Sequence, residues 1–173
     1  MLSKQSLHRF SRFKNMNSAL SPIRILLVHD HQLMRAGLRL LLEREPDFYV
    51  MAEAADVAQT LEAASQDPDI ILLNLKLGRE SGLDVLLQLP EISTHARVIV
   101  LTDSADAEPQ QRAVRHGAMG VVVKTDTPAV LFEAIRKVRL GEVWLHRAIV
   151  AAVLRDLVHP KESEPSVSEV PKH

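Results

Sequence analysis

The stretch DIILLNLKLGRESG, residues 69–82, begins with an apolar run of isoleucines and leucines that ends at Asn74. The length of this run and its Ile/Leu content are typical of a strand that is buried on both faces of a parallel sheet. In such sheets, ligands bind at the carboxyl ends of the strands. The stretch therefore predicts an α/β fold, and it places an amide, which is neither acid, base nor nucleophile, where chemistry is expected.

Apolar runs of this kind alternate with amphipathic stretches along most of the chain. Five strands are predicted at residues 23–28, 49–54, 69–74, 97–102 and 120–124. Helices are predicted after them at residues 31–45, 56–66, 83–89, 108–117 and 128–141, and the third of these helices is expected to stop at Pro90. Five consecutive strand–helix units predict a doubly wound, five-stranded parallel sheet with helices on both faces. A sixth helix is predicted at residues 146–158.

The chain divides into one domain with a polar segment at each end. Residues 23–143 form the predicted domain, and residues 144–158 hold the C-terminal helix. Residues 1–22 are basic and contain no acid, a pattern that also suits an organellar transit segment or a nucleic-acid-binding arm. We favour a disordered leader, or a start of translation at Met16. Residues 159–173 are rich in Pro, Ser and Glu and are expected to be a disordered tail.

The composition excludes several classes of protein. An apolar share of 46%, a charged share of 25% and a net charge of −1 are ordinary for a soluble domain and give no global attraction to nucleic acid or anionic membranes. The absence of cysteine excludes disulfides, thiolate catalysis and cysteine-based zinc sites. No apolar stretch is long enough to cross a bilayer, so we expect a soluble, cytoplasmic protein.

Polar side chains follow four of the five predicted strands. His29 and Asp30 follow the first strand, Asn74 ends the third, Thr102 ends the fourth and Lys124 ends the fifth. A doubly wound sheet gathers these strand ends around one crevice. We therefore predict that the five residues share one site.

The segments around these positions resemble the receiver domain of bacterial response regulators, which has a CheY-like, flavodoxin-like fold. The resemblance is carried by IRILLVHDHQLMRAGLRLLLEREPDFYVMAEAAD at 23–56, RVIVLTD at 97–103, AVRHGAMGVVVK at 113–124 and AIRKVRLGEVWL at 134–145. These segments are most similar to the receivers that precede a LuxR-type helix-turn-helix in NarL-like transcription factors. The resemblance spans nearly everything between the two polar ends, and it implies a role in two-component signalling.

In that family a histidine kinase passes a phosphoryl group to an aspartate that ends the third strand. Two acids after the first strand help to hold Mg²⁺, and a Thr or Ser and a Lys grip the phosphoryl oxygens. By this resemblance Asn74 stands at the acceptor position, and His29 and Asp30 stand at the acidic pair. Thr102 and Lys124 are the retained phosphate-gripping residues. The resemblance therefore implies that the acceptor and one acid have been replaced.

These replacements predict a degenerate phosphorylation site. An amide cannot become an acyl phosphate, so Asn74 is expected to keep only the shape and the hydrogen bonds of the site. With Asp30 as the single remaining carboxylate, we expect weak or absent Mg²⁺ binding and no cofactor. Lys124 is expected to pair with Asp30 or to donate to the Asn74 carbonyl, and Thr102 to cap the following loop. The aromatic residue that changes rotamer on activation in the family corresponds to Val121.

The sequence HDH at residues 29–31 leaves a second interpretation open. Imidazole and carboxylate groups suit zinc or nickel. However, His31 is expected to open the first helix and to point away from the crevice, so we predict no metal site. His29 alone could make the site respond to pH.

The sixth predicted helix carries an apolar stripe of Ile149, Val150, Val153, Leu154 and Leu157. An exposed stripe of this kind often marks an interface. Alternatively, the stripe packs against the domain's own fifth helix. The two arrangements are compatible, since each can apply to different residues.

The sequence favours an interaction module that works without phosphorylation and is not an enzyme. Its expected partner is a signalling protein or a second copy, bound through the fourth, fifth or sixth helix, with no direct DNA binding and no membrane. The alternative is the receiver half of a LuxR-type transcriptional regulator whose helix-turn-helix is missing or encoded separately. A third hypothesis, phosphorylation of Asp103 or Ser81 instead, is disfavoured because neither has the in-line geometry of the original site.

Overall fold

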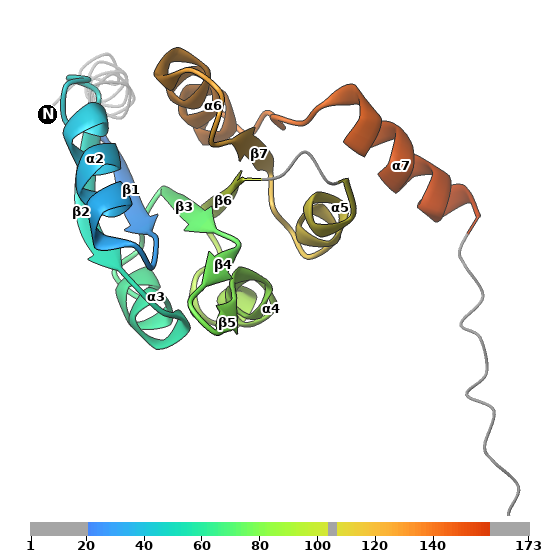
Figure 1. Cartoon of the computed structure of the whole chain (residues 1–173), viewed down its shortest axis with the longest axis horizontal. Helices are drawn as coiled ribbons and strands as arrows, with labels where there is room; N and C mark the ends of the chain where they lie inside the picture. The colour runs from blue at the N-terminus through green and yellow to red at the C-terminus, as the bar shows by residue number, and fades with distance from the viewer. Residues whose placement is uncertain (1–20, 104–106, 160–173) are drawn as a thin grey trace, which may run out of the picture.

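Five parallel strands form the central sheet of the computed structural model, which describes residues 21–103 and 107–159. Their spatial order is β2-β1-β3-β6-β7 (Figure 1). The strands are β1 (Ile23–Val28), β2 (Phe48–Ala54), β3 (Ile70–Asn74), β6 (Arg97–Thr102) and β7 (Gly120–Val123). The order reverses between β1 and β3, which is the place where doubly wound sheets bind ligands. The predicted doubly wound fold is confirmed.

Helices cover both faces of this sheet. α2 (Gln32–Leu42) and α6 (Pro128–Arg139) lie on one face, and α3 (Val57–Ala64), α4 (Gly82–Ile92) and α5 (Ala107–Arg115) lie on the other (Figure 1). α7 (Arg147–Val158) follows at the side of α5. None of the described helices is long and apolar enough to span a bilayer.

The uniform apolarity of β3 follows from its position between the two helical layers. Ile70 and Leu72 pack in the cluster formed with α2 and α6, whereas Ile71 and Leu73 pack in the cluster on the opposite face. All four side chains are completely buried. Because successive side chains of a strand point to opposite faces, a strand that is covered on both sides needs an apolar residue at every position.

Two features near the end of β3 differ from the prediction. The helix expected to stop at Pro90 continues to Ile92, since a proline in the last turn removes only its own N–H and Ser93 N–H still donates to the Leu89 carbonyl. A short antiparallel ribbon, β4 (Lys76–Leu77) with β5 (Glu80–Ser81), lies between β3 and α4. Two-residue strands are too short to leave a periodic pattern in the sequence.

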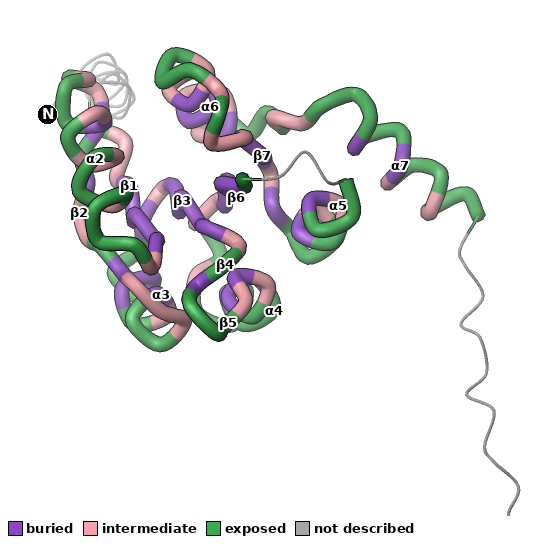
Figure 2. The backbone as a smooth tube through the Cα atoms, in the orientation of Figure 1, coloured by how far each residue is buried: buried purple, intermediate pink, exposed green. Residues whose placement is uncertain are grey.

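α7 corrects the prediction for the apolar stripe. The helix packs mainly against α5, the fourth predicted helix, whereas packing against the fifth was expected, and Asp156 pairs with Arg115 at the end of α5. Ile149 and Ala152 are buried, and Val153 packs against the same core. The remaining stripe residues, Val150, Leu154 and Leu157, are exposed, as the largely green tube of α7 shows (Figure 2). The stripe is therefore divided between a packed side and an open side.

The predicted leader and tail fall almost wholly outside the described residues. Met16 also lies outside them, so the two possible starts of translation stay untested. The boundaries proposed between leader, domain, C-terminal helix and tail likewise stay predictions.

Candidate functional site

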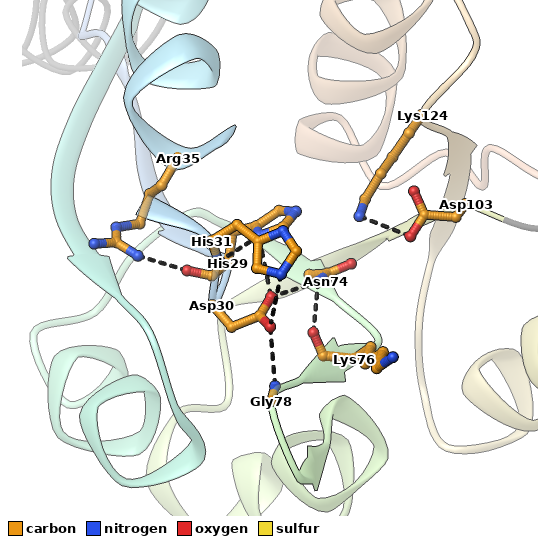
Figure 3. Close-up of polar contacts among 9 residues, drawn as sticks. All are labelled: His29, Asp30, His31, Arg35, Asn74, Lys76, Gly78, Asp103 and Lys124. Atoms are coloured by element: carbon orange, nitrogen blue, oxygen red, sulfur yellow. Dashed lines mark hydrogen bonds and ion pairs between the residues drawn. The ribbon is translucent and has the colours of Figure 1, made fainter. Parts of the chain in front are cut away.

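The structure brings the five predicted site residues to the carboxyl edge of the sheet. Figure 3 shows all of them except Thr102, which ends β6. Residues 28 and 73 pair in register on β1 and β3, so His29 and Asn74 emerge side by side. His29, Asn74 and Thr102 are buried, with exposed fractions of 1%, 4% and 7%. Lys124 N–H donates to the Thr102 carbonyl over 2.8 Å, which continues the pairing of β7 with β6.

The side chain of Asn74 is held by two acceptors. Its Nδ2 lies 3.1 Å from Asp30 Oδ1 and 2.5 Å from the carbonyl oxygen of Lys76 (Figure 3). Both neighbours are oxygen atoms without a hydrogen to give, so the nitrogen and not the oxygen of the amide must face them. Asn74 therefore uses its two N–H groups to connect the loop after β1 with the loop after β3.

The residues present do not fit a divalent cation. Carboxylate and carbonyl oxygens such as those of Asp30 and Lys76 are the ligands that Mg²⁺ prefers. Here both oxygens face the Asn74 N–H groups, which carry partial positive charge and no lone pair for a metal. Within residues 21–103 and 107–159, no group of three His, Asp or Glu side chains is placed to hold a metal ion.

Asp30 also fixes the loop that follows β3. Its Oδ2 accepts a hydrogen bond from Gly78 N–H over 3.0 Å, and Gly78 has a φ of +64°, a conformation that favours glycine. Burial alone would raise the pKa of Asp30, but the N–H donors of Gly78 and of Asp30 itself, together with the two neighbouring histidines, hold this pKa below its ordinary value. Asp30 is therefore ionised at neutral pH.

His29 is a buried, neutral imidazole. Its Nδ1 accepts a hydrogen bond from His31 N–H over 3.1 Å and lies 3.2 Å from Asp30 Oδ1, while Nε2 is buried without a partner. Burial lowers the pKa of His29, the Lys124 ammonium lowers it further, and the Asp30 carboxylate opposes both effects. Protonation would let Nδ1 donate to Asp30, but it would also place a charge in the interior.

His31 and Lys124 differ from the predictions made for them. His31 does precede α2, as its N-cap, but Nε2 lies 3.6 Å from Asp30 Oδ2, so its ring does not point away from the site. Lys124 pairs with neither Asp30 nor Asn74: its Nζ donates to Asp103 Oδ2 over 3.0 Å (Figure 3). Both oxygens of Asp30 already accept N–H donors, whereas Asp103 follows the neighbouring strand end and is 76% exposed. In the sequence, the position of Asp103 directly after the fourth predicted strand was the available indication of its pair with Lys124.

The other predicted positions stay without a tested role. Val121 is fully buried in β7, and its N–H donates to the Trp144 carbonyl over 2.9 Å. The loop that Thr102 is expected to cap includes residues 104–106, which lie outside the described part of the chain. Ser81 is the N-cap of α4, where its Oγ accepts from Leu83 N–H over 3.2 Å, so its hydroxyl already serves the helix end.

The sheet order and the polar cluster at its switch point define a receiver-type signalling domain. The chain belongs to the response regulator receiver domain family, whose family model matches residues 25–136. It is similar to the nitrate/nitrite response regulator protein NarL of Escherichia coli K12, with 37% identity over 138 residues, which are 78% of this chain and 64% of NarL. The chain thus spans about 64% of the length of that relative.

Two further similarities agree with this membership. The transcriptional regulatory protein LiaR of Bacillus subtilis is 32% identical over 142 residues, which cover 82% of this chain and 67% of LiaR. The crystal structure of a LuxR-family two-component response regulator from Aurantimonas sp. SI85-9A1 matches with a TM-score of 0.71 and 31% identity, over 80% of this chain and 99% of that one. The fold and family that the sequence predicted are confirmed.

Proposed function

We propose that this receiver domain acts without phosphorylation, as a protein–protein interaction module of two-component signalling. The supporting observation is the environment of Asn74, whose amide nitrogen donates to Asp30 and to the Lys76 carbonyl. An amide held in this way has no nucleophilic oxygen to offer a phosphoryl donor, and it occupies the oxygens that a cation would need. The proposed role is binding, with no catalysed reaction.

The proposed output is a surface whose shape the site maintains permanently. The bonds of Asp30 and Asn74 hold the loop after β3, and the Lys124–Asp103 pair connects the ends of β6 and β7. We propose a protein partner, or a second copy of the chain, on the face built from α5, β7, α6 and α7. We propose no direct DNA binding by this chain.

Nuclear magnetic resonance tests the proposal with Asn74→Asp as the matched control. Amide spectra of both proteins are recorded with Mg²⁺ before and after addition of beryllofluoride, which imitates a phosphoryl group. We expect no change in the wild type and shifts around residue 74 in the variant. Shifts around Asn74 in the wild-type spectrum, or a phosphorylated wild-type protein after incubation with acetyl phosphate, would refute the proposal.

A second function is favoured by the relatives. NarL and LiaR are named as a response regulator and a transcriptional regulatory protein, and the chain spans about 64% of NarL. The chain would then be the receiver half of a LuxR-type regulator whose helix-turn-helix is missing or encoded separately. Reading the gene beyond its last codon tests this function: a helix-turn-helix in the same or an adjacent frame supports it, and unrelated sequence removes it.

A further inference from the structure

The solvent-exposed side of α7 is apolar. Leu154, Leu157 and Val158 are 55%, 73% and 71% exposed, and Val150 lies one turn earlier on the same side. Positions 150, 154 and 157 recur at the spacing that aligns side chains along one helix face. The opposite side of α7 is the one that packs on the domain, through Ile149 and its neighbours. The exposed row, Val150, Leu154, Leu157 and Val158, is called the α7 ridge below.

The charged side chains of α5 and α7 are predominantly positive. α5 and α7 carry four arginines, Arg112, Arg115, Arg147 and Arg155, and two acids, Glu108 and Asp156. Asp156 is already paired with Arg115. On α7 itself the exposed charges are therefore Arg147 and Arg155, and Arg155 Nε donates to the carbonyl of Ala151 in its own helix. A basic rim of this kind, in a chain with a net charge of −1, is a local feature.

We propose that the α7 ridge docks an amphipathic helix of a partner protein that presents apolar residues flanked by Asp or Glu. The inference rests on the proposed function and specifies the partner's chemistry. An apolar face with a basic rim is complementary to an apolar face with an acidic rim. Pairing of two α7 ridges is disfavoured, because it would bring the arginines of both copies together without an acid to match them.

Site-specific photo-cross-linking in the native host tests this docking. Leu157 is replaced by p-benzoylphenylalanine in the full chain, and the matched control carries the same group at Leu40, which is 66% exposed on α2. We expect an adduct from position 157 only. The cross-linked peptide should show apolar residues at helical spacing together with Asp or Glu.

A synthetic peptide of the cross-linked segment then gives the contribution of charge. We expect Arg147→Glu with Arg155→Glu to weaken peptide binding at least about tenfold, which corresponds to about 1.4 kcal/mol. The matched variant Arg147→Lys with Arg155→Lys should bind within about threefold of the wild type, since it keeps the charge. Because Arg147 and Arg155 are exposed, we expect all the variants to fold, and circular dichroism melting checks that they do.

Several outcomes would overturn the inference. These are no adduct at position 157, an adduct with a second copy of the chain, a cross-linked peptide without acids, and peptide affinity that is insensitive to charge reversal. Failure of the proposed function has a different result. If the adduct forms only after treatment with acetyl phosphate, the α7 ridge is a docking surface but the domain depends on phosphorylation.

Discussion

The Asn74 amide has nearly the shape of a carboxylate, but its nitrogen donates hydrogen bonds where a carboxylate oxygen would accept them. Its nitrogen donates to Asp30 and to the Lys76 carbonyl. A carboxylate here would repel the Asp30 charge and could not donate to the carbonyl unless it were protonated. That Asn74 accepts no phosphoryl group stays a prediction from the sequence. The sequence did not indicate that the Lys76 carbonyl would be the second partner, because that contact depends on the path of the β3–α4 loop.

Asn74→Asp is expected to make stability depend on Mg²⁺. Without a divalent cation, the new carboxylate lies beside Asp30, and we expect the free energy of unfolding to fall by about 1–3 kcal/mol. Mg²⁺ binding to the folded variant should return part of this loss. Urea unfolding in Mg²⁺ or EDTA measures both effects. Equal stability of the variant in the two buffers, or a marked stabilisation of the wild type by Mg²⁺, would contradict this account.

His29 is expected to make the fold sensitive to mild acid. Its pKa is lowered in the folded state, so below its ordinary value of 6.5 the unfolded chain binds a proton that the folded chain does not. The stability that His29 contributes is therefore complete above pH 6.5 and decreases as the pH falls from 6.5 toward the folded-state pKa. The decrease has a limiting slope of about 1.4 kcal/mol per pH unit.

Urea unfolding between pH 5 and pH 8 measures this slope, with His29→Asn as the control. The Asn side chain can still accept from His31 N–H but does not titrate. The wild type should lose stability relative to the variant as the pH falls below 6.5, and parallel curves would show that folding does not lower the pKa of His29.

Gly82, at the start of α4, lies close to the backbone that follows β3. A Cβ at this position would lie 2.7 Å from the Asn74 carbonyl oxygen and 3.0 Å from Leu75 Cα, and neither backbone atom can move easily. We expect Gly82→Ala to lower the free energy of unfolding by about 1–3 kcal/mol. Gly37→Ala is the matched control in α2, where a Cβ meets no atom within 4 Å. That substitution should stabilise the protein by about 0.5–1 kcal/mol. Chemical denaturation of the two variants decides whether the close approach at Gly82 matters.

Among the elements, the sequence was most informative for the strands and least informative for α7. The strands are uniformly apolar because both faces are covered, and this pattern has few other interpretations. Trp144 follows α6 and pairs with Gly120 of β7, and the direction of the chain after this bridge determines that α7 packs on α5. No periodic pattern in the sequence predicts that direction. The Lys124–Asp103 pair was missed for a related reason. Whether Asp30 or Asp103 accepts from Lys124 depends on the hydrogen bonds that loops distant in the sequence make to each carboxylate.

At the scale of the molecule, the described residues form an apolar cluster on each face of the sheet, and α7 contributes Ile149 to the cluster that includes α3, α4 and α5. Ile149 is 2% exposed in the cluster formed with α3, α4 and α5. We expect Ile149→Ala to cost about 2–5 kcal/mol in free energy of unfolding. Leu157→Ala, on the exposed side of the same helix, should change it by less than about 0.5 kcal/mol. Thermal or urea unfolding of the two variants compares them, and similar losses would show that α7 is packed differently.

The connection from Asp30 through Asn74 to the β3–α4 loop has a consequence for timing in the cell. Bonds between residues of one chain form when the protein folds and last until it unfolds, without a donor enzyme or a hydrolysis step. In the function proposed here, no chemical lifetime limits the signal-competent shape. The amount of output would then follow the rates at which the cell synthesises and degrades the protein.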